Sequence, residues 1–171
     1  MMRFLLLFSL LLLSACNNSH QSLAIDEPLP SITVQNAQGQ TVKLPDDFKG
    51  KVLLIKFWSL DCHFCDKNSF FALDKLYQKY KTAGFIPLSI HEGKNANDER
   101  LKQFQALSYP LLHDEYNAAA KRLGLISLPT TFIVDRDGRV RKKISGEAKM
   151  EELEVFFTTI LNKGGSNENA H

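Results

Sequence analysis

The hydrophobic positions of the chain fall into runs that predict alternating strands and helices. Residues 52–58 are almost continuously apolar, as in a central strand that is covered on both faces. Residues 66–81 instead repeat their apolar side chains with a helical period, and Gly84 follows as a stop signal. Further strands are expected at 31–34, 41–44, 85–90, 130–134 and 140–145, and further helices at 97–107, 116–123 and 149–161.

The order of these elements predicts an α/β fold. The short runs at 31–34 and 41–44 surround a turn and indicate an N-terminal β-hairpin, and a second hairpin joins the last two strands. Helices that alternate with buried strands are typical of a mixed central sheet flanked by helices. We therefore expect one domain over residues 31–163, which a chain of 171 residues accommodates.

The composition excludes several classes of protein. Twelve Phe among 171 residues supply a core, and three cysteines are too few for a disulfide-dense miniprotein. The 21 basic and 19 acidic residues give a net charge of +2. Such a balance lacks the basic surface that nucleic-acid binding requires, so we expect no nucleic-acid partner.

The first residues indicate export and lipid attachment. Arg3 precedes an apolar segment that is too short to span a bilayer but has the length of a signal-peptide core. The following Leu13-Ser14-Ala15-Cys16 resembles the lipobox of bacterial lipoproteins. This resemblance implies a signal peptide at 1–15 and a diacylglycerol on Cys16, which would anchor the protein in the membrane of the cell envelope. The alternative is ordinary signal cleavage beside an unmodified cysteine.

Two terminal segments are expected to lie outside the domain. Residues 16–30 are polar and contain prolines, which predicts a tether between the lipid and the domain. Residues 164–171 are rich in Gly, Asn and Ser, which predicts a frayed tail. Asn17, rather than Asp, follows the lipidated cysteine and resembles the pattern for outer-membrane sorting in bacteria with two membranes, with the domain on the periplasmic side.

The remaining cysteines, Cys62 and Cys65, form a C-x-x-C motif between the central strand and the first long helix. Backbone N–H groups and the dipole at a helix N-terminus favour a thiolate, and such surroundings lower a cysteine pKa from its usual ~8.5. We expect Cys62 to be the more exposed nucleophile and Cys65 to resolve mixed disulfides. A structural disulfide and a zinc site are alternatives, whereas haem attachment is excluded because Asp66, not His, follows the second cysteine.

Two separated segments carry a resemblance to a known family. Phe57-Trp58-Ser59-Leu60-Asp61-Cys62-His63-Phe64-Cys65 and, later, Leu128-Pro129-Thr130-Thr131-Phe132-Ile133-Val134-Asp135-Arg136-Asp137-Gly138 resemble the thioredoxin superfamily, and within it the membrane-anchored TlpA/ResA-like thiol–disulfide oxidoreductases. The resemblance implies a thioredoxin-like sandwich. It also implies a redox-active Cys62–Cys65 disulfide.

The resemblance assigns roles to four further residues. Pro129 would be a cis-proline facing the cysteines, and the Leu128 backbone would pair with an extended substrate segment. Trp58 would lie beside the cysteines as part of the substrate-binding surface. Glu92 matches a functional glutamate of ResA-like proteins, and partial burial would raise its pKa so that it exchanges protons with sulfur during catalysis. A solvated loop position is the alternative for Glu92.

Lys56 departs from the pattern, because thioredoxin carries an acidic residue at this place in the buried strand. A lysine there is either buried with a lowered pKa or extends its ammonium group to solvent, and we expect the second arrangement because an unpaired buried ammonium is costly.

The expected activity is dithiol–disulfide exchange with other envelope proteins, including apocytochrome c, most simply as a reductase. Its redox partner would be a membrane electron donor, or an electron acceptor if the protein oxidises its substrates. No cofactor or metal is required, because the two sulfurs carry the electrons. His63 favours the opposite, oxidising direction, since its cation would stabilise the thiolate.

Two other functions remain open. A thiol peroxidase is suggested by Ser59, which stands three residues before Cys62, although Ile55 occupies the place of the proline that peroxiredoxins carry. A Sco-like copper-binding chaperone would use both cysteines with His91 or His113. The four histidines other than His63 are otherwise expected in the tether, in loops and in the tail.

Overall fold

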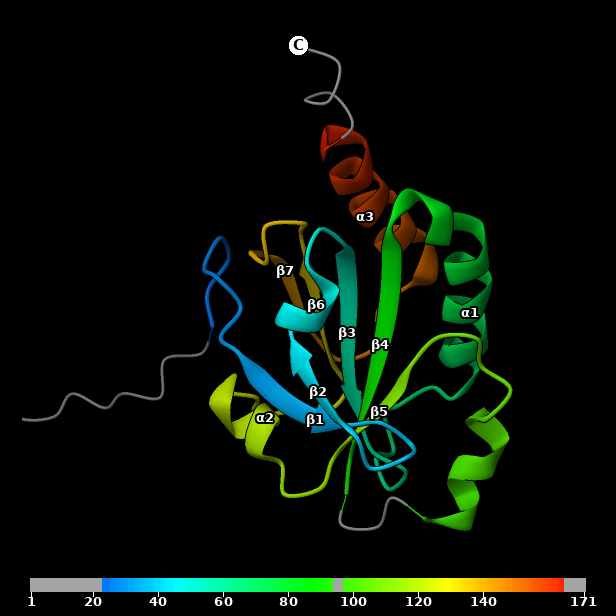
Figure 1. The fold of residues 1–171 in the computed structure, drawn as a ribbon. Helices are drawn as coiled ribbons and strands as arrows, with labels where there is room; N and C mark the ends of the chain where they lie inside the picture. Colours follow the sequence, from blue (N-terminus) through cyan, green and yellow to red (C-terminus); the bar gives the residue numbers. More distant parts are fainter. Residues whose placement is uncertain (1–22, 94–96, 165–171) are drawn as a thin grey trace, which may run out of the picture.

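The computed structural model describes residues 23–93 and 97–164, which form one seven-stranded sheet with helices on both faces (Figure 1). The strands follow the order β2-β1-β5-β4-β3-β6-β7 across the sheet. The strands are β1 (Ile32–Gln35), β2 (Thr41–Leu44), β3 (Val52–Trp58), β4 (Phe85–Glu92), β5 (Leu111–Asp114), β6 (Thr130–Val134) and β7 (Val140–Ser145). The helices are α1 (Asn68–Tyr80), α2 (Ala118–Arg122) and α3 (Met150–Gly164), with 3₁₀ turns η1 (Asp46–Phe48), η2 (Lys81–Ala83) and η3 (Glu99–Phe104).

The sheet is mixed, with its parallel strands in the centre. β3, β4 and β5 run parallel to one another, whereas β6 and β7 continue the sheet antiparallel on one side and β1 and β2 do so on the other. Every residue of β3 is buried, as the continuous apolar run predicts for a strand covered on both faces.

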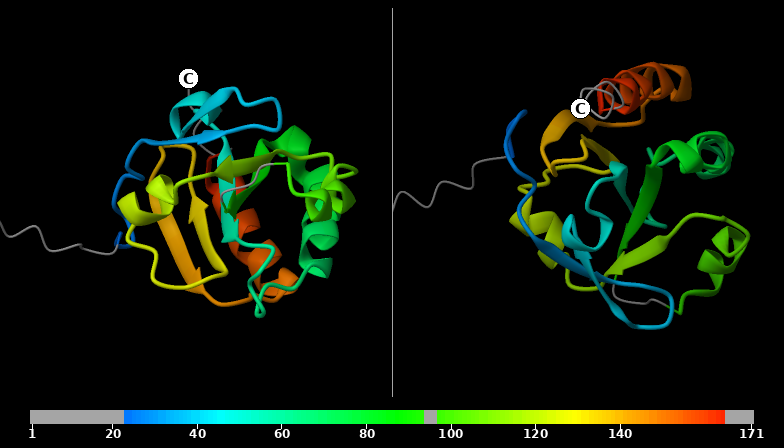
Figure 2. Two further views of the ribbon diagram at one scale, coloured as in Figure 1. Left: turned by 90° about the horizontal axis from the view of Figure 1, so that it is seen from below. Right: turned by 45° about the horizontal axis from the view of Figure 1, so that its top comes forward.

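The helices divide between the two faces of the sheet (Figure 2). α1 and α3 pack on one face, where Phe85 of β4 stacks on Phe157 of α3 with ring centroids 4.0 Å apart. α2 covers the other face with Ala119 and Ala120, together with Leu123 directly after the helix. β3 therefore lies between two apolar layers, and this arrangement fixes the point at which its carboxyl end leaves the sheet.

The expected fold class is confirmed, including the N-terminal hairpin, in which β1 pairs antiparallel with β2. Several details differ from the sequence expectation, most clearly the following. The stretch 97–107 forms only the 3₁₀ turn η3, the first long helix begins at Asn68 rather than at residue 66, and β5 was not expected. β5 escapes the periodicity argument because it has four residues, two of which, His113 and Asp114, are polar yet buried.

The expected tether is shorter than predicted. Within the described residues, Leu23 and Leu29 are buried in the core. The backbone N–H of Asp26 donates to the Val140 carbonyl, and Pro28 forms a bridge with Arg139. Residues 23–30 thus belong to the domain because their two leucines cover its apolar surface. The predicted signal segment 1–15, the predicted lipidation site Cys16 and most of the predicted tail lie outside the described residues, and Gly164 ends α3.

Among residues 23–93 and 97–164, no helix has both the length and the apolar character needed to cross a bilayer.

Candidate active site

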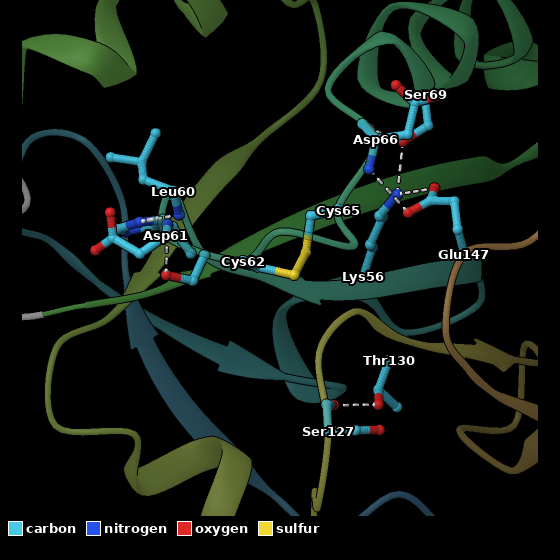
Figure 3. Close-up of a disulfide and its surroundings, with 12 residues drawn as sticks. Lys56, Leu60, Asp61, Cys62, Cys65, Asp66, Ser69, Ser127, Thr130 and Glu147 are labelled. Atoms are coloured by element: carbon cyan, nitrogen blue, oxygen red, sulfur yellow. Dashed lines mark hydrogen bonds and ion pairs between the residues drawn. A yellow bond between two sulfur atoms is a disulfide. The ribbon is translucent and has the colours of Figure 1, made fainter.

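Cys62 and Cys65 form a disulfide in the turns that connect β3 to α1 (Figure 3). Their Cα atoms are 5.4 Å apart. The Cys62 N–H donates to the Ser59 carbonyl, and the Cys65 N–H donates to the Cys62 carbonyl. These consecutive turns bring the two sulfurs together directly beyond the buried strand.

The two cysteines precede α1 rather than opening it. The helix begins at Asn68, and the Asp66 carboxylate accepts a hydrogen bond from the Asn68 N–H at 2.9 Å. An aspartate side chain competes in this way for backbone donors at a helix start. The Asn68 N–H, one of the helix donors expected to stabilise a thiolate, is therefore bonded to the Asp66 carboxylate instead.

The two sulfur-bearing residues differ in exposure. Cys65 is buried, with 6% of its surface exposed, and it packs in a cluster with Trp58, Leu60 and Phe70. Cys62 is only partly buried and lies at the margin of the same cluster. Cys62 is thus the more accessible of the two cysteines, which is the exposure order expected from the sequence.

The segment before β6 faces the cysteine cluster. The Leu128–Pro129 peptide bond is cis, as the family resemblance implied, and Leu128 packs against the cluster that holds Cys65. The Pro129 carbonyl accepts from the Gly146 N–H at 2.8 Å, and the Thr130 hydroxyl donates to the Ser127 carbonyl at 2.7 Å. These bonds fix the segment that contains Leu128, and Ser127 and Thr130 on either side of it lie below the disulfide in Figure 3.

Trp58 lies beside the cysteines, as the resemblance implied, but it is fully buried. Its ring packs against Phe70, His91 and Phe104 at centroid distances of 4.5–5.0 Å. No part of it is open to a partner protein in this structure. The direct substrate contact expected for Trp58 is therefore not supported, and its role is to pack under the disulfide.

Glu92 ends β4, where its backbone aligns with Asp114 of β5. It lines a cavity of about 280 Å³ together with Leu128, and a smaller one of about 150 Å³ together with Ser59, Leu60 and Asp61, which precede Cys62. Burial, and then the charge of Asp114, raises its pKa from 4.5 to about 7. Glu92 thus lies between the two segments that flank the disulfide and titrates near neutrality.

Two buried histidines beneath the site were expected in loops but lie in strands. His91 of β4 and His113 of β5 face each other with their Nδ1 atoms 3.2 Å apart. The Leu60 N–H donates to His91 Nε2, which places the His91 proton on Nδ1. Burial, and then the charge of His113, lowers the pKa of His91 to about 4, so the ring stays neutral.

The His91 ring also explains Gly93, because a Cβ at Gly93 would lie 2.7 Å from His91 Cε1. His113 was expected in a loop because β5 was not predicted, and His91 because β4 continues to Glu92, beyond the expected end at residue 90.

Lys56 does not extend to solvent as expected. Its side chain is 3% exposed, and Nζ forms an ion pair with Glu147 and donates to the Ser69 hydroxyl at 2.6 Å. Burial lowers its pKa, while the bond to Glu147 acts in the opposite direction. The expectation was wrong because it assumed an unpaired ammonium, whereas Glu147, 91 residues away in sequence, supplies the partner.

The alternatives retained from the sequence gain no support from this geometry. The Ser59 hydroxyl accepts from the Asp61 N–H, two residues along the chain. Within the described part of the chain, no group of three or more His, Cys, Asp or Glu side chains is placed to hold a metal ion. The two cysteines are instead bonded to each other.

Comparison with known proteins agrees with this arrangement. The AhpC/TSA family matches residues 25–143. The chain belongs to this family. Among curated relatives, it is 33% identical over 145 residues to the thiol-disulfide oxidoreductase ResA of a Bacillus cereus strain, covering 84% of this chain and 82% of that protein. A ResA of Bacillus thuringiensis is 34% identical over 142 residues, covering 82% of this chain and 80% of its own length.

Solved structures of other proteins share the fold. A candidate thiol:disulfide interchange protein DsbE from Chlorobium tepidum superposes with a TM-score of 0.74 at 26% identity, over 82% of this chain and 99% of its own. The thioredoxin domain of a thiol-disulfide oxidoreductase from Bacteroides vulgatus gives a TM-score of 0.68 at 21% identity, over 82% and 99% of the two chains. This AhpC/TSA protein is a thiol–disulfide oxidoreductase of the ResA type.

We predict that Glu92→Gln changes how stability depends on pH. Because the pKa of Glu92 is raised from 4.5 to about 7, its contribution to the free energy of unfolding is complete below pH 4.5 and is lost as the pH rises through about 7. The neutral variant should therefore be more stable than the wild type above pH 7, and this advantage should shrink towards pH 4.5. Urea unfolding of the oxidised wild type and variant, from pH 4.5 to above pH 7, measures this difference in the free energy of unfolding.

Glu151→Gln, which removes an exposed carboxylate on α3, is the matched control. A difference between wild type and Glu92→Gln that is the same at both ends of the range would contradict the burial of Glu92.

Proposed function

We propose that the protein works outside the cytoplasm, where it reduces disulfides in other proteins of the cell envelope through Cys62 and Cys65. The observation that carries this proposal is the asymmetric disulfide: Cys62 is accessible, Cys65 is buried, and the cis-Pro129 segment lies beside them. An exposed and a buried sulfur in one disulfide suit a sequence of two exchange steps.

The reaction proceeds by two thiol–disulfide exchanges. In the reduced protein, the Cys62 thiolate attacks one sulfur of the substrate disulfide, forms a mixed disulfide and releases the other substrate sulfur as a thiolate. The Cys65 thiolate then attacks Cys62, which releases the second substrate sulfur and leaves Cys62–Cys65 oxidised. Two electrons pass from the cysteine pair to the substrate, and the released thiolates take up two protons.

Three further residues have roles in this proposal. The Leu128 backbone beside cis-Pro129 holds an extended substrate segment across the disulfide. Glu92, whose pKa is raised to about 7, exchanges protons with the sulfurs from between the flanking segments. Glu92 and Leu128 line the same cavity of about 280 Å³, and Leu128 also contacts the cluster that holds Cys65.

The proposed cellular location of the protein and the proposed direction of electron transfer rest on the sequence. The segment 1–15 and the Leu13–Cys16 motif support export and a lipid anchor at Cys16, with the domain on the periplasmic side and outer-membrane sorting in a cell with two membranes. Reduction requires a membrane electron donor that returns the oxidised pair to dithiol. Apocytochrome c is one envelope protein whose cysteines would be substrates.

We predict that Cys65→Ser traps substrate proteins, because the first exchange remains and the resolving thiol is lost. After expression in the native host, the variant should carry disulfide-linked adducts that run at higher mass on non-reducing gels and disappear on reduction. Cys62→Ser is the control and should carry few. Equal trapping by the two variants would show that the roles of Cys62 and Cys65 are wrongly assigned.

We also predict a reducing potential for the Cys62/Cys65 couple. A protein that reduces substrates should equilibrate with glutathione near thioredoxin's value of about −270 mV, whereas a strong oxidant lies near about −120 mV. Tryptophan fluorescence reports the two redox states, since the single tryptophan, Trp58, packs in the cluster that holds Cys65. A value near the oxidising limit would overturn the proposed direction while leaving disulfide exchange itself in place.

A further inference from the structure

A buried charge lies on the face of β3 that carries the disulfide cluster. Lys56 and Trp58 stand two residues apart on β3 and therefore point to the same face. Lys56 Nζ lies 5.0 Å from the centroid of the Phe70 ring, which packs with Trp58 and Cys65. The ammonium group is thus part of the surroundings of the buried cysteine, as Figure 3 shows.

The Lys56 ammonium is connected to both backbone groups of Asp66, the residue that follows Cys65. On one side, Lys56 pairs with Glu147 Oε1, and Glu147 Oε2 accepts from the Asp66 N–H at 3.3 Å. On the other side, Lys56 donates to the Ser69 hydroxyl, which donates to the Asp66 carbonyl at 2.6 Å. The Lys56 ammonium group thus fixes the peptide groups on both sides of the Asp66 Cα, one through Glu147 and the other through Ser69.

Glu147 is itself held in place by the cis-proline segment. It follows Gly146, whose N–H donates to the Pro129 carbonyl and whose φ of +94° is one that residues with a side chain rarely adopt. The Glu147 side chain is 27% exposed, so without Lys56 it has a route to solvent. The ammonium is therefore what draws this carboxylate inward to Asp66.

We propose that Lys56 and Glu147 are a positioning pair for Cys65, which fix the backbone after this cysteine so that its sulfur is aligned to attack Cys62. This proposal rests on the proposed function, in which Cys65 resolves the mixed disulfide. Neither side chain reacts. Their effect is confined to the second exchange, because the hydrogen bonds end on Asp66 and not on the partly exposed Cys62.

The two exchanges can be timed separately with an aryl disulfide, dithiobis-nitrobenzoate. Cys62 of the reduced protein attacks this reagent, releases one coloured thiolate and keeps the other in a mixed disulfide. Cys65 then displaces the second coloured thiolate. Stopped-flow absorbance therefore gives a bimolecular phase for Cys62 and a unimolecular phase for Cys65, each releasing one equivalent.

We predict that Glu147→Gln and Lys56→Met slow the unimolecular phase about tenfold, because each removes a hydrogen bond to a charged group. The bimolecular phase should stay within about twofold of the wild type. The double variant Lys56→Met/Glu147→Gln should be no slower than the slower single variant, since both changes disrupt one network. The double variant also leaves no unpaired buried charge, which protects its folding.

A matched control pair joins α1 to α3. Lys79 of α1 pairs with Glu154 of α3 at 2.7 Å, with the Lys79 side chain 61% exposed. Lys79→Met/Glu154→Gln should leave both phases unchanged. Urea unfolding of each oxidised variant checks that the fold persists.

The outcomes distinguish this proposal from the function on which it rests. A wild-type protein without a second phase, or a Cys65→Ser variant that still shows one, would overturn the role of Cys65 and the positioning proposal with it. A normal wild-type second phase that is unchanged in the double variant would overturn the positioning proposal alone. Equal slowing of both phases would also overturn it, because that result indicates general distortion of the site.

Discussion

The structure depends on one strand that is buried on both faces. β3 lies between the layer of α1 and α3 and the layer of α2, and no residue along it is open to solvent. A strand held in this way ends at a fixed point, so the turns that follow it place Cys62 and Cys65 reproducibly. Because the chain leaves the core there, one sulfur lies at the surface while the other remains among apolar side chains.

Two sets of polar groups at this site have hydrogen-bond partners, which limits the cost of burying them, whereas Trp58 Nε1, Glu92 Oε1 and His113 Nε2 are buried without one among the described residues. Lys56 pairs with Glu147, and the neutral His91 accepts a hydrogen bond from the backbone before Cys62 and contacts His113. Each set connects a central strand to a segment that flanks a cysteine. Partnered buried groups of this kind fix geometry more strongly than apolar contacts, because a displaced member would be left unsatisfied in a region of low dielectric. The site is therefore held from below by electrostatics as well as by packing.

The features of the fold and of the site that could be predicted from the sequence are those that local sequence patterns determine. The continuous apolar run of β3, the C-x-x-C motif after it and the later Leu128–Pro129 segment predicted the fold and the members of the site, and the cis bond followed from the resemblance. β5, and with it the strand position of His113, was missed because a four-residue strand with polar buried residues has no periodicity, and His91 was missed because β4 extends two residues beyond its apolar run. The burial of Lys56 was misjudged because its partner Glu147 comes near only through the fold. Long-range polar pairing leaves no signal in a single sequence.

We infer that Cys62 is an accessible sulfur that ionises readily and exchanges with the buried Cys65. The most direct test is the pH dependence of Cys62 alkylation by iodoacetamide in the reduced protein, followed by mass spectrometry. We expect Cys62 to react before Cys65 and to reach half its maximal alkylation rate below the ordinary cysteine pKa of about 8.5. A rate that keeps rising into strongly alkaline solution, or faster reaction at Cys65, would contradict it.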